Sequence, residues 1–494
     1  MSAPEFEAAV GRTAAATMAA SFRDPAGSLL AMDGRILRLV TAAGADDLNA
    51  FLGTKPAAEL LESGKVVPTR VLDRAEIEVL LEAPAFRALY ESAPVAQVVE
   101  HERIWFPSYP YEWPPEMLHA AGEFTLELAR GLLSAGIGLK DATPYNVLFR
   151  GPEPVFIDLL SFERRDPDDP TWLPYAQFVR TFVLPLMANR YFGIAIEQIL
   201  STRRDGLEPE EVYRWLGPLQ KLRPPFLSLV SMPSWLASRH DRDDASIYRK
   251  RSAGNPEKAR FILESLLGGL SRQLRRLRPN PGRQSVWSDY MSANNNYSSG
   301  AFAAKETFVR EALTEFAPRR VLDVGCNTGH FSALAARTGA KVVAIDYDPV
   351  VLGDVWRAAR TSGLDILPLM VNLTRPTPGI GWRNRECPAF LDRARGAFDG
   401  IVMLAVVHHM LVTERVPLPD ILALAAELTT GMAVIEYIGP EDSMFRRLVR
   451  GREELHKDLT PGLFEAACLR HFEIVRSRQV EGSHRRLYLL RKAG

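Results

Sequence analysis

Several features that would mark a specialised class of protein are rare or missing in this chain of 494 residues. Its three cysteines, Cys326, Cys387 and Cys468, lie far apart, which excludes a disulfide framework and a CxxC zinc motif and fits a reducing compartment. No apolar run approaches the roughly 18–20 residues that span a bilayer. The formal net charge is +0, so no global field attracts nucleic acid or an anionic membrane. We therefore expect neither nucleic-acid binding nor membrane insertion.

The composition is otherwise that of an ordinary globular protein, with 47% hydrophobic and 24% charged residues. The first residues include Glu5 and Glu7 and lack the basic-then-apolar pattern of a secretory signal, so we expect a cytoplasmic protein. The length predicts more than one domain. No pattern in the sequence indicates an oligomeric state.

The strongest break in the chain is "RLRPNPGRQSVWSDYMSANNNYSSG", where proline, glycine, asparagine and serine interrupt a helical pattern. It predicts two domains, residues 1–277 and 278–494. In the second, short apolar runs such as "RRVLDVG", "KVVAID" and "FDGIVMLAVV" alternate with helical segments. This alternation predicts an α/β fold whose mostly parallel sheet is covered on both faces, and the last two runs predict an antiparallel end.

A glycine-rich turn follows the first of these runs, in "VLDVGCNTGHF". Gly325 and Gly329 let the backbone approach a ligand closely, and Asp346 ends the next run, where a carboxylate accepts ribose hydroxyls. A dinucleotide fingerprint needs glycine at the position of Asn327, and Asp323 suits the ammonium of a methionine better than a pyrophosphate. The pattern therefore favours S-adenosylmethionine (SAM) over a dinucleotide.

With these motifs, residues 290–494 resemble class I SAM-dependent methyltransferases, which have a Rossmann-like fold. The resemblance implies that Asp323, Gly325 and Gly329 shape the methionine pocket, that Asp346 holds the ribose and that Asn372 lies near the adenine. Asn327, within the same loop, is a further cofactor-binding candidate. The segments "WSDYMSANNNYSSGAFAAKETFV" and "VIEYIGPEDSMF" resemble the NoeA-like nodulation-protein family. That resemblance implies Tyr290, Tyr297 and Lys305 as pocket residues, Glu436 and Asp442 toward the acceptor, and a small-molecule or glycan-type methyl acceptor.

Two adjacent histidines, His408 and His409, follow "FDGIVMLAVV". Ligands bind beyond the carboxyl ends of strands in open α/β sheets, so we expect one of the two to act as a base or to orient the acceptor. Adjacent histidines point in different directions and no third ligand is evident, so a metal site is not expected.

The first domain contains a second pattern, "GLKDATPYNVLFRGPEPVFIDLLSFE". Asp141, Asn146 and Asp158 have the spacing of the catalytic-loop aspartate, the metal-binding asparagine and the metal-binding aspartate of protein kinases, which this part of the chain resembles. ATP and Mg²⁺ are then the candidate ligands. A hairpin with its turn at Asp33-Gly34 and a pair of strands within "VAQVVEHERIWFPSYPYEW" predict a small β lobe before a helical lobe.

The departures from kinases predict a degenerate module. The first hundred residues have no G-x-G-x-x-G loop, and the only lysines before Lys140 are Lys55 and Lys65. Arg38 is the available cation, yet arginine does not simply replace lysine. We therefore expect an α+β, kinase-like accessory or substrate domain before the methyltransferase. The alternatives are a bifunctional enzyme with an active ATP-dependent phosphotransferase, a non-catalytic SAM-binding scaffold, and locally an Asp158 that pairs with a nearby arginine.

Overall fold

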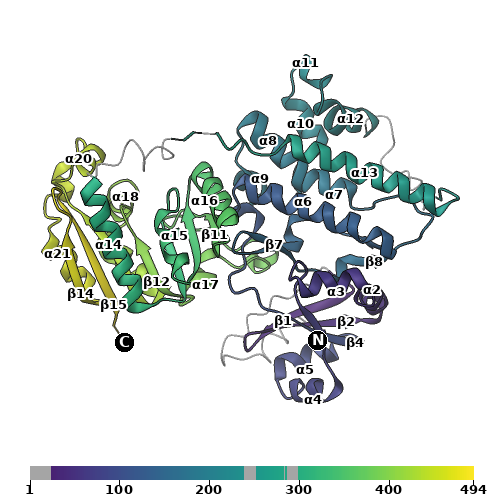
Figure 1. Cartoon of the computed structure of the whole chain (residues 1–494), viewed down its shortest axis with the longest axis horizontal. Helices are drawn as coiled ribbons and strands as arrows, with labels where there is room; N and C mark the ends of the chain where they lie inside the picture. The colour runs from purple at the N-terminus through teal and green to yellow at the C-terminus, as the bar shows by residue number, and fades with distance from the viewer. Residues whose placement is uncertain (1–23, 238–251, 283, 286–298, 494) are drawn as a thin grey trace.

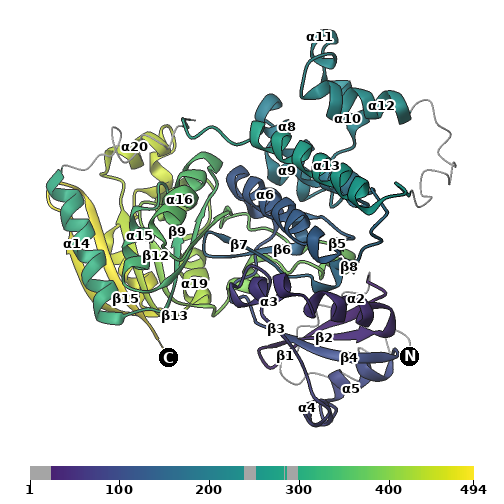
Figure 2. The same cartoon turned by 45° about the vertical axis from the view of Figure 1, so that its right-hand side comes forward.

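The computed structural model describes residues 24–237, 252–282, 284–285 and 299–493. The chain forms two bodies, which lie at the right and left of Figure 1, and the first body is divided into a β-rich lower lobe and a helical upper lobe. Figure 2 shows the same division after a turn of the molecule. The predicted order of a small β lobe, a helical lobe and an α/β domain is confirmed.

The small lobe is a four-stranded antiparallel sheet in the order β1-β2-β4-β3, with helices around it. Its elements are β1 (Gly27–Met32), β2 (Arg35–Thr41), α2 (Ala42–Leu52), α3 (Lys55–Glu62), β3 (Thr69–Val71), α4 (Arg74–Leu80), α5 (Pro84–Glu91) and β4 (Val95–His101). Asp33 and Gly34 have φ of 49° and 78°, the left-handed values that a tight hairpin turn requires. The predicted hairpin is therefore confirmed.

The predicted second strand after β4 is wrong. The chain leaves the sheet at His101, and the aromatic segment that follows contains only a 3₁₀ turn at Pro110–Glu112. Prolines at positions 107, 110, 114 and 115 explain this, because each lacks the N–H that a strand ladder needs.

The large lobe is built around α6, a buried helix with the described helical segments packed about it and two small two-stranded sheets beside it. One antiparallel pair joins β5 (Ile137–Leu139) to β8 (Phe162–Arg164), and the other is a hairpin of β6 (Val147–Arg150) and β7 (Glu153–Phe156). The helices are α6 (Pro115–Gly131), α7 (Tyr175–Phe178), α8 (Leu184–Phe192), α9 (Ile196–Leu200), α10 (Pro209–Trp215), α11 (Pro218–Lys221), α12 (Met232–Ala237) and α13 (Pro256–Arg276). None of the helices within the described ranges has the length and apolarity required to cross a bilayer.

The second domain is a seven-stranded sheet in the order β11-β10-β9-β12-β13-β15-β14, flanked by helices. Its strands are β9 (Arg320–Val324), β10 (Lys341–Asp346), β11 (Ile366–Met370), β12 (Phe398–Met403), β13 (Thr429–Ile438), β14 (Phe472–Gln479) and β15 (Arg485–Lys492). Its helices are α14 (Ser299–Phe316), α15 (His330–Arg337), α16 (Pro349–Ser362), α17 (Phe390–Ala394), α18 (Val407–Val412), α19 (Leu418–Leu428), α20 (Ser443–Val449) and α21 (Pro461–Cys468).

The order of these strands positions a ligand crevice. Strands β9 to β13 run parallel, and β15 is antiparallel to both β13 and β14, as predicted for the end of the sheet. The chain moves from β9 outward to β11 and then returns to β12 on the other side of β9. Such a reversal opens a crevice at the carboxyl ends of the two strands where it occurs, β9 and β12.

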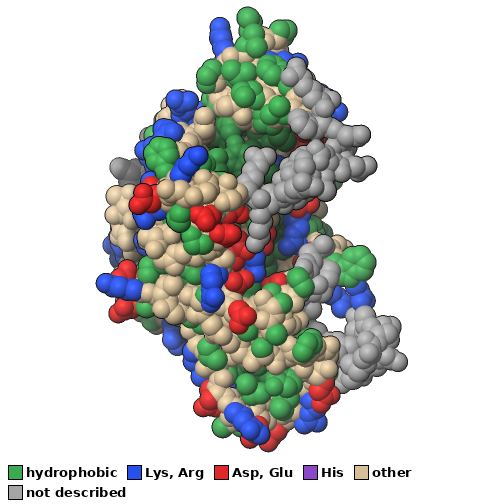
Figure 3. Space-filling view, turned by 90° about the vertical axis from the view of Figure 1, so that its right-hand side faces the viewer, with side chains coloured by type: hydrophobic (Ala, Val, Ile, Leu, Met, Phe, Trp, Pro, Cys, Tyr) green, Lys and Arg blue, Asp and Glu red, His purple; other side chains and the backbone are tan. Residues whose placement is uncertain are grey.

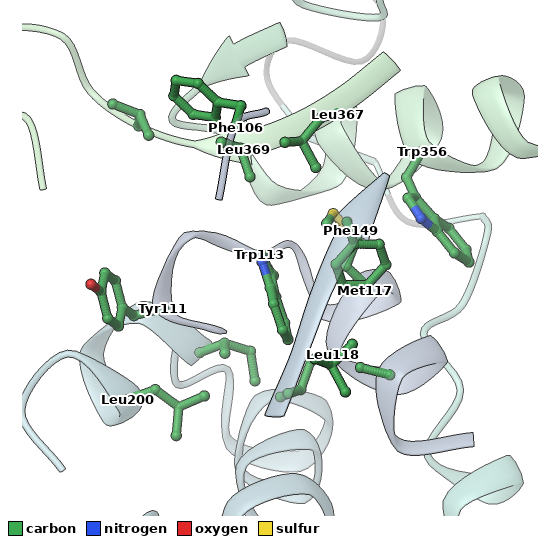
Figure 4. Packing of buried hydrophobic residues seen from close by; sticks show 14 of the residues in the cluster. Phe106, Tyr111, Trp113, Met117, Leu118, Phe149, Leu200, Trp356, Leu367 and Leu369 are labelled. Carbon is green, nitrogen blue, oxygen red and sulfur yellow. The ribbon is translucent and has the colours of Figure 1, made fainter. Parts of the chain in front are cut away.

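The two domains share one continuous apolar core. Figure 4 shows Trp113 and Phe149 of the first domain close to Trp356 and Leu367 of the second. The indole nitrogen of Trp356 also donates to the carbonyl of Pro152, at 3.0 Å. Both domains thus contribute side chains to one buried interface.

A buried ion pair crosses this interface. The Arg393 guanidinium on α17 binds the Glu112 carboxylate, with side chains 5% and 0% exposed, and donates to the carbonyl of Pro107 at 2.6 Å. It also lies over the rings of Phe106 and Tyr109, at 5.4 and 5.0 Å from their centroids. Removing one partner of such a pair is costly because the other charge stays buried.

We predict that Arg393→Ala lowers the free energy of unfolding by about 3–5 kcal/mol, because Glu112 is then left buried without its cation. Urea unfolding followed by tryptophan fluorescence measures the change. Arg395→Ala is the matched control, since Arg395 pairs with Glu427 on the surface, and its effect should stay below about 1 kcal/mol. Equal effects of the two substitutions would contradict the role of the buried pair.

Candidate functional site

The loop between β9 and α15 wraps around the end of β10. The amides of Gly325 and Cys326 donate to the carbonyl of Ile345 at 2.9 and 3.1 Å. Gly325 and Gly329 have φ of 70° and 78°, and a Cβ at Gly329 would lie 2.8 Å from Val355. Only glycine fits both positions without strain, so the glycine pattern in the sequence has a backbone cause.

Asp346 sits inside this loop at the end of β10. Its carboxylate accepts hydrogen bonds from three backbone amides, those of Asn327 at 3.0 Å, Tyr347 at 2.8 Å and Asp348 at 3.1 Å. Burial raises the pKa of this carboxyl group despite the three donors. The loop and the carboxylate are thereby fixed to one another, as a site for a ligand hydroxyl requires.

Asp323 lies at the neighbouring strand end and is buried, with 4% of its surface exposed. The Ser332 hydroxyl on α15 donates to its carboxylate at 2.5 Å. Burial raises the pKa of Asp323 to about 6, although the Ser332 hydrogen bond opposes the shift. Sequence reasoning found Asp323 but missed Ser332, whose position nine residues downstream carries no motif.

Asn372 follows β11, where the sequence placed it. Its side-chain oxygen already accepts from the Thr374 amide at 3.0 Å and the Thr374 hydroxyl at 2.6 Å. A hydrogen bond from an adenine amine to this oxygen would therefore compete with the hydrogen bonds of the local turn. Tyr290 and Tyr297 lie outside the described residues.

His408 and His409 lie in the first turn of α18, beyond the end of β12. Their rings are 4.2 Å apart, and His408 is the more deeply buried. Within the described part of the chain, the Nδ1 atom of His408 is buried without a hydrogen-bond partner. Burial lowers the pKa of His408 well below its usual value, and His409, Arg485 and Lys305 lower it further, so its imidazole is neutral at neutral pH.

Lys305 belongs to a buried network of charges beside His408. The Lys305 ammonium lies 2.7 Å from the Glu436 carboxylate, and the Arg485 guanidinium lies 3.9 Å from Glu436 and 2.8 Å from Asp442. Asp442 also caps α20 by accepting from the amides that follow it. Sequence reasoning missed Arg485, because its run "RRLYLLRK" is typical of a strand whose arginines face solvent.

The kinase-like motif is brought together between the lobes of the first domain. Asp158 follows β7 and accepts from the Ser161 hydroxyl, and Ser161 in turn accepts from the Asn146 amide at 3.0 Å. The side-chain amide of Gln177 donates to Asp141 at 3.3 Å, and burial raises the pKa of Asp141. The three motif residues thus share one region of the fold.

Arg38 occupies the position of a cation beside Asp158. It lies on β2, is 7% exposed, binds the Asp158 carboxylate directly and lies 3.2 Å from Asp24. We call Arg38, Asp158, Ser161 and Asn146 the Arg38 clasp. The pKa of Asp158 is lowered despite burial, because Arg38 and Ser161 stabilise its charged form. Arg38 therefore occupies one oxygen of the carboxylate that a metal ion would need, and the Ser161 hydroxyl occupies the other.

Metal-ligating side chains do not gather elsewhere in the ranges that the structure describes. No group of three or more His, Cys, Asp or Glu side chains there has the arrangement of a metal site. The cysteines Cys326, Cys387 and Cys468 are all buried and unbonded to one another.

The crevice, the glycine loop and the acidic strand ends define a methyltransferase of the SAM-binding, Rossmann-like type. A family model described as "Methyltransferase domain" matches residues 297–481. The crystal structure of the N-methyltransferase NodS from Bradyrhizobium japonicum WM9 with S-adenosyl-L-homocysteine is similar at 16% identity, covering 43% of this chain and 95% of that one, with a TM-score of 0.31. The bifunctional kinase-methyltransferase WbdD is similar at 17% identity, covering 41% of each chain, with a TM-score of 0.29.

A sequence relative matches almost the whole chain. The nodulation protein NoeA of Rhizobium meliloti (strain 1021) is 30% identical over 478 residues, which are 96% of both chains. The chain therefore belongs to the NoeA family, and the predicted resemblance is confirmed.

We predict that the affinity for S-adenosylhomocysteine falls as the pH drops through the pKa of Asp323, about 6. The ionised carboxylate attracts the ligand's ammonium and the protonated form does not, so binding should weaken about tenfold between pH ~7.5 and pH ~5. Titration calorimetry at the two pH values measures this. Asp323→Asn should bind weakly with little pH dependence, whereas Asp392→Asn, on the exposed side of α17, should behave as wild type. A full pH response in Asp323→Asn would assign the titration to another group, such as Asp346.

We also predict that the protein does not bind ATP·Mg²⁺ at millimolar nucleotide, because Arg38 neutralises the carboxylate that magnesium needs. Arg38→Ala should lower the free energy of unfolding by about 3 kcal/mol, since Asp158 loses its cation. Arg74→Ala, whose pair with Glu78 is exposed, should change it by less than about 1 kcal/mol. Calorimetry and urea unfolding provide the two measurements. Magnesium-dependent ATP binding that disappears in Asp158→Ala would instead show that the clasp opens for nucleotide.

Proposed function

We propose that this protein transfers a methyl group from SAM to a hydroxyl of a small-molecule or glycan-type acceptor. The observation that carries the proposal is His408, a buried neutral histidine with an unpartnered Nδ1, located at the crevice of a methyltransferase domain. The glycan-type acceptor rests on the family resemblance. Three buried cysteines that form no disulfide support a location in the reducing cytoplasm.

The residues at the crevice fit SAM. Asp323 offers a buried carboxylate for the ammonium, and Asp346 offers a fixed carboxylate for ribose hydroxyls. The loop from Gly325 through Asn327 to Gly329 provides backbone that a ligand approaches closely. Asn372 is assigned to the adenine end, and Lys305, whose ammonium is held by Glu436, is assigned to the wall of the pocket.

When bound, SAM supplies a methyl group already activated by its sulfonium sulfur, so the protein's task is to align the acceptor and handle its proton. His408 takes up at Nδ1 the proton that an acceptor hydroxyl loses. Its low pKa makes it a weak base, and the nearby cations of Arg485 and Lys305 compensate by stabilising negative charge on the acceptor oxygen. An amine acceptor needs no base at the rate-limiting step, so a buried neutral histidine serves a hydroxyl acceptor better.

We assign the first domain the role of a brace and acceptor-holding module that has lost phosphotransfer. The Arg38 clasp supports this assignment, because it fills the metal-binding end of the kinase-like motif with a side chain. The bifunctional alternative requires ATP·Mg²⁺ turnover. The scaffold alternative requires SAM binding without methylation of any acceptor.

The direct test is methyl transfer from radiolabelled SAM to a panel of free mono- and oligosaccharides, with polypeptides and RNA as contrasts. We expect label and S-adenosylhomocysteine to form with a saccharide carrying free hydroxyls. His408→Ala should lower the turnover rate by about 10²–10⁴-fold while the affinity for S-adenosylhomocysteine stays unchanged. His409→Ala, the neighbouring and less buried position, should retain more than about a tenth of the rate. A turnover rate that neither substitution changes would show that neither histidine acts as the base. Binding of S-adenosylhomocysteine without turnover on any member of the panel would favour the non-catalytic scaffold.

A further inference from the structure

The helical lobe of the first domain ends in a protruding tip of unusual composition. Residues 212–237 contain Arg214, Lys221 and Arg223 and no aspartate or glutamate, although 24% of the whole chain is charged. Most of the other residues in this segment are leucine, proline, tryptophan, valine or another apolar type. A local cationic and apolar segment therefore sits within a chain whose formal net charge is +0.

Apolar side chains at this tip face solvent. Leu219 on α11 is 70% exposed, Leu222 just after it is 62% exposed, and Trp215 at the end of α10 is 39% exposed. Helix α11 lies at the upper extremity of the molecule in both Figure 1 and Figure 2. Figure 3 shows hydrophobic side chains gathered at this end. The surface is convex, a shape suited to entering a soft layer rather than to enclosing a ligand.

The charges at the tip are of one sign and available. Among the described residues, no ion pair involves Arg214, Lys221 or Arg223. The Lys221 ammonium lies over the ring of Tyr213, 3.9 Å from its centroid. Of the acidic residues at the start of α10, Glu208 and Glu211 are paired with Arg180 and Arg203, and Glu210 lies one helical turn before Arg214.

We propose that this tip, the apex patch of Arg214, Trp215, Leu219, Lys221, Leu222 and Arg223, docks the protein on the surface of an anionic phospholipid bilayer. Leucine and tryptophan side chains that project beside lysine and arginine are the combination that partitions into a lipid headgroup region. The cations meet the negative surface potential, and the two leucines remove apolar area from water. A protein partner of complementary charge would need an acidic groove, whereas the lipid surface needs only the convex shape that the tip has.

The test is co-sedimentation of the full chain with vesicles of phosphatidylcholine alone or with phosphatidylglycerol added. We expect binding to the anionic vesicles that weakens as salt is raised, and much weaker binding to the neutral ones. Leu219→Gln combined with Leu222→Gln should lower the partition coefficient at least roughly tenfold. Lys221→Gln combined with Arg223→Gln should lower it roughly 25-fold on anionic vesicles and leave neutral vesicles unchanged.

Leu455→Gln combined with Leu469→Gln is the matched control, since these leucines are 73% and 60% exposed on the second domain. That control should bind vesicles as wild type does. Absence of binding to anionic vesicles at millimolar lipid would overturn the proposal. So would a concentration-dependent dimer that the Leu219→Gln and Leu222→Gln pair abolishes, because the apex patch would then belong to a contact between two copies. Unchanged affinity for S-adenosylhomocysteine verifies that each variant is folded.

Discussion

The contact between Arg393 and Glu112 is the constraint on which the arrangement of the two domains depends. Both side chains are almost fully buried, so neither charge is tolerated without the other. Aromatic rings around the guanidinium and the shared apolar core then favour one relative placement of the domains. Apolar packing alone is less directional, and a buried ion pair adds the geometric selectivity that a methyl acceptor held by both domains would need.

Buried charge recurs at both candidate sites with opposite chemical consequences. In the first domain, Arg38 satisfies Asp158 and leaves little charge for a ligand to neutralise. In the second, Lys305 and Arg485 share Glu436 and lie near His408, whose Nδ1 has no protein partner in the described chain. Buried nitrogens without a protein partner in the described chain occur in both networks, Arg38 Nε in the first and His408 Nδ1 in the second, and of these two atoms it is His408 Nδ1 that lies beside the methyltransferase crevice, where a bound group would satisfy it. This contrast favours methyl transfer as the chemistry of the chain.

The sequence predicted those features that local backbone geometry imposes. The glycines at 325 and 329, the hairpin at Asp33-Gly34 and the strand ends at Asp323 and Asp346 all follow from short-range rules. The sequence offered an arginine partner for Asp158 as an alternative and Arg38 as the available cation, but it did not join the two, which lie 120 positions apart. The pairing of Arg485 with Asp442 depends on which face of a strand is covered. Neither the separation of two residues along the chain nor the composition of the chain predicts which of them form such contacts. The prediction of a strand in the aromatic segment after β4 was wrong for another reason. It gave more weight to the strand propensity of the aromatic residues than to the prolines among them.

For contact with a charged surface, the local distribution of charge matters more in this protein than its formal net charge. A formal net charge of +0 argues against long-range attraction to a membrane, and that argument holds for the molecule as a whole. Attraction within a Debye length of about 8–10 Å depends on the charges near the contact, and the apex patch itself contributes three cations and no carboxylate. The same neutral chain therefore combines a buried, balanced network at its methyltransferase crevice with an unbalanced, exposed cluster at the far tip of the first domain.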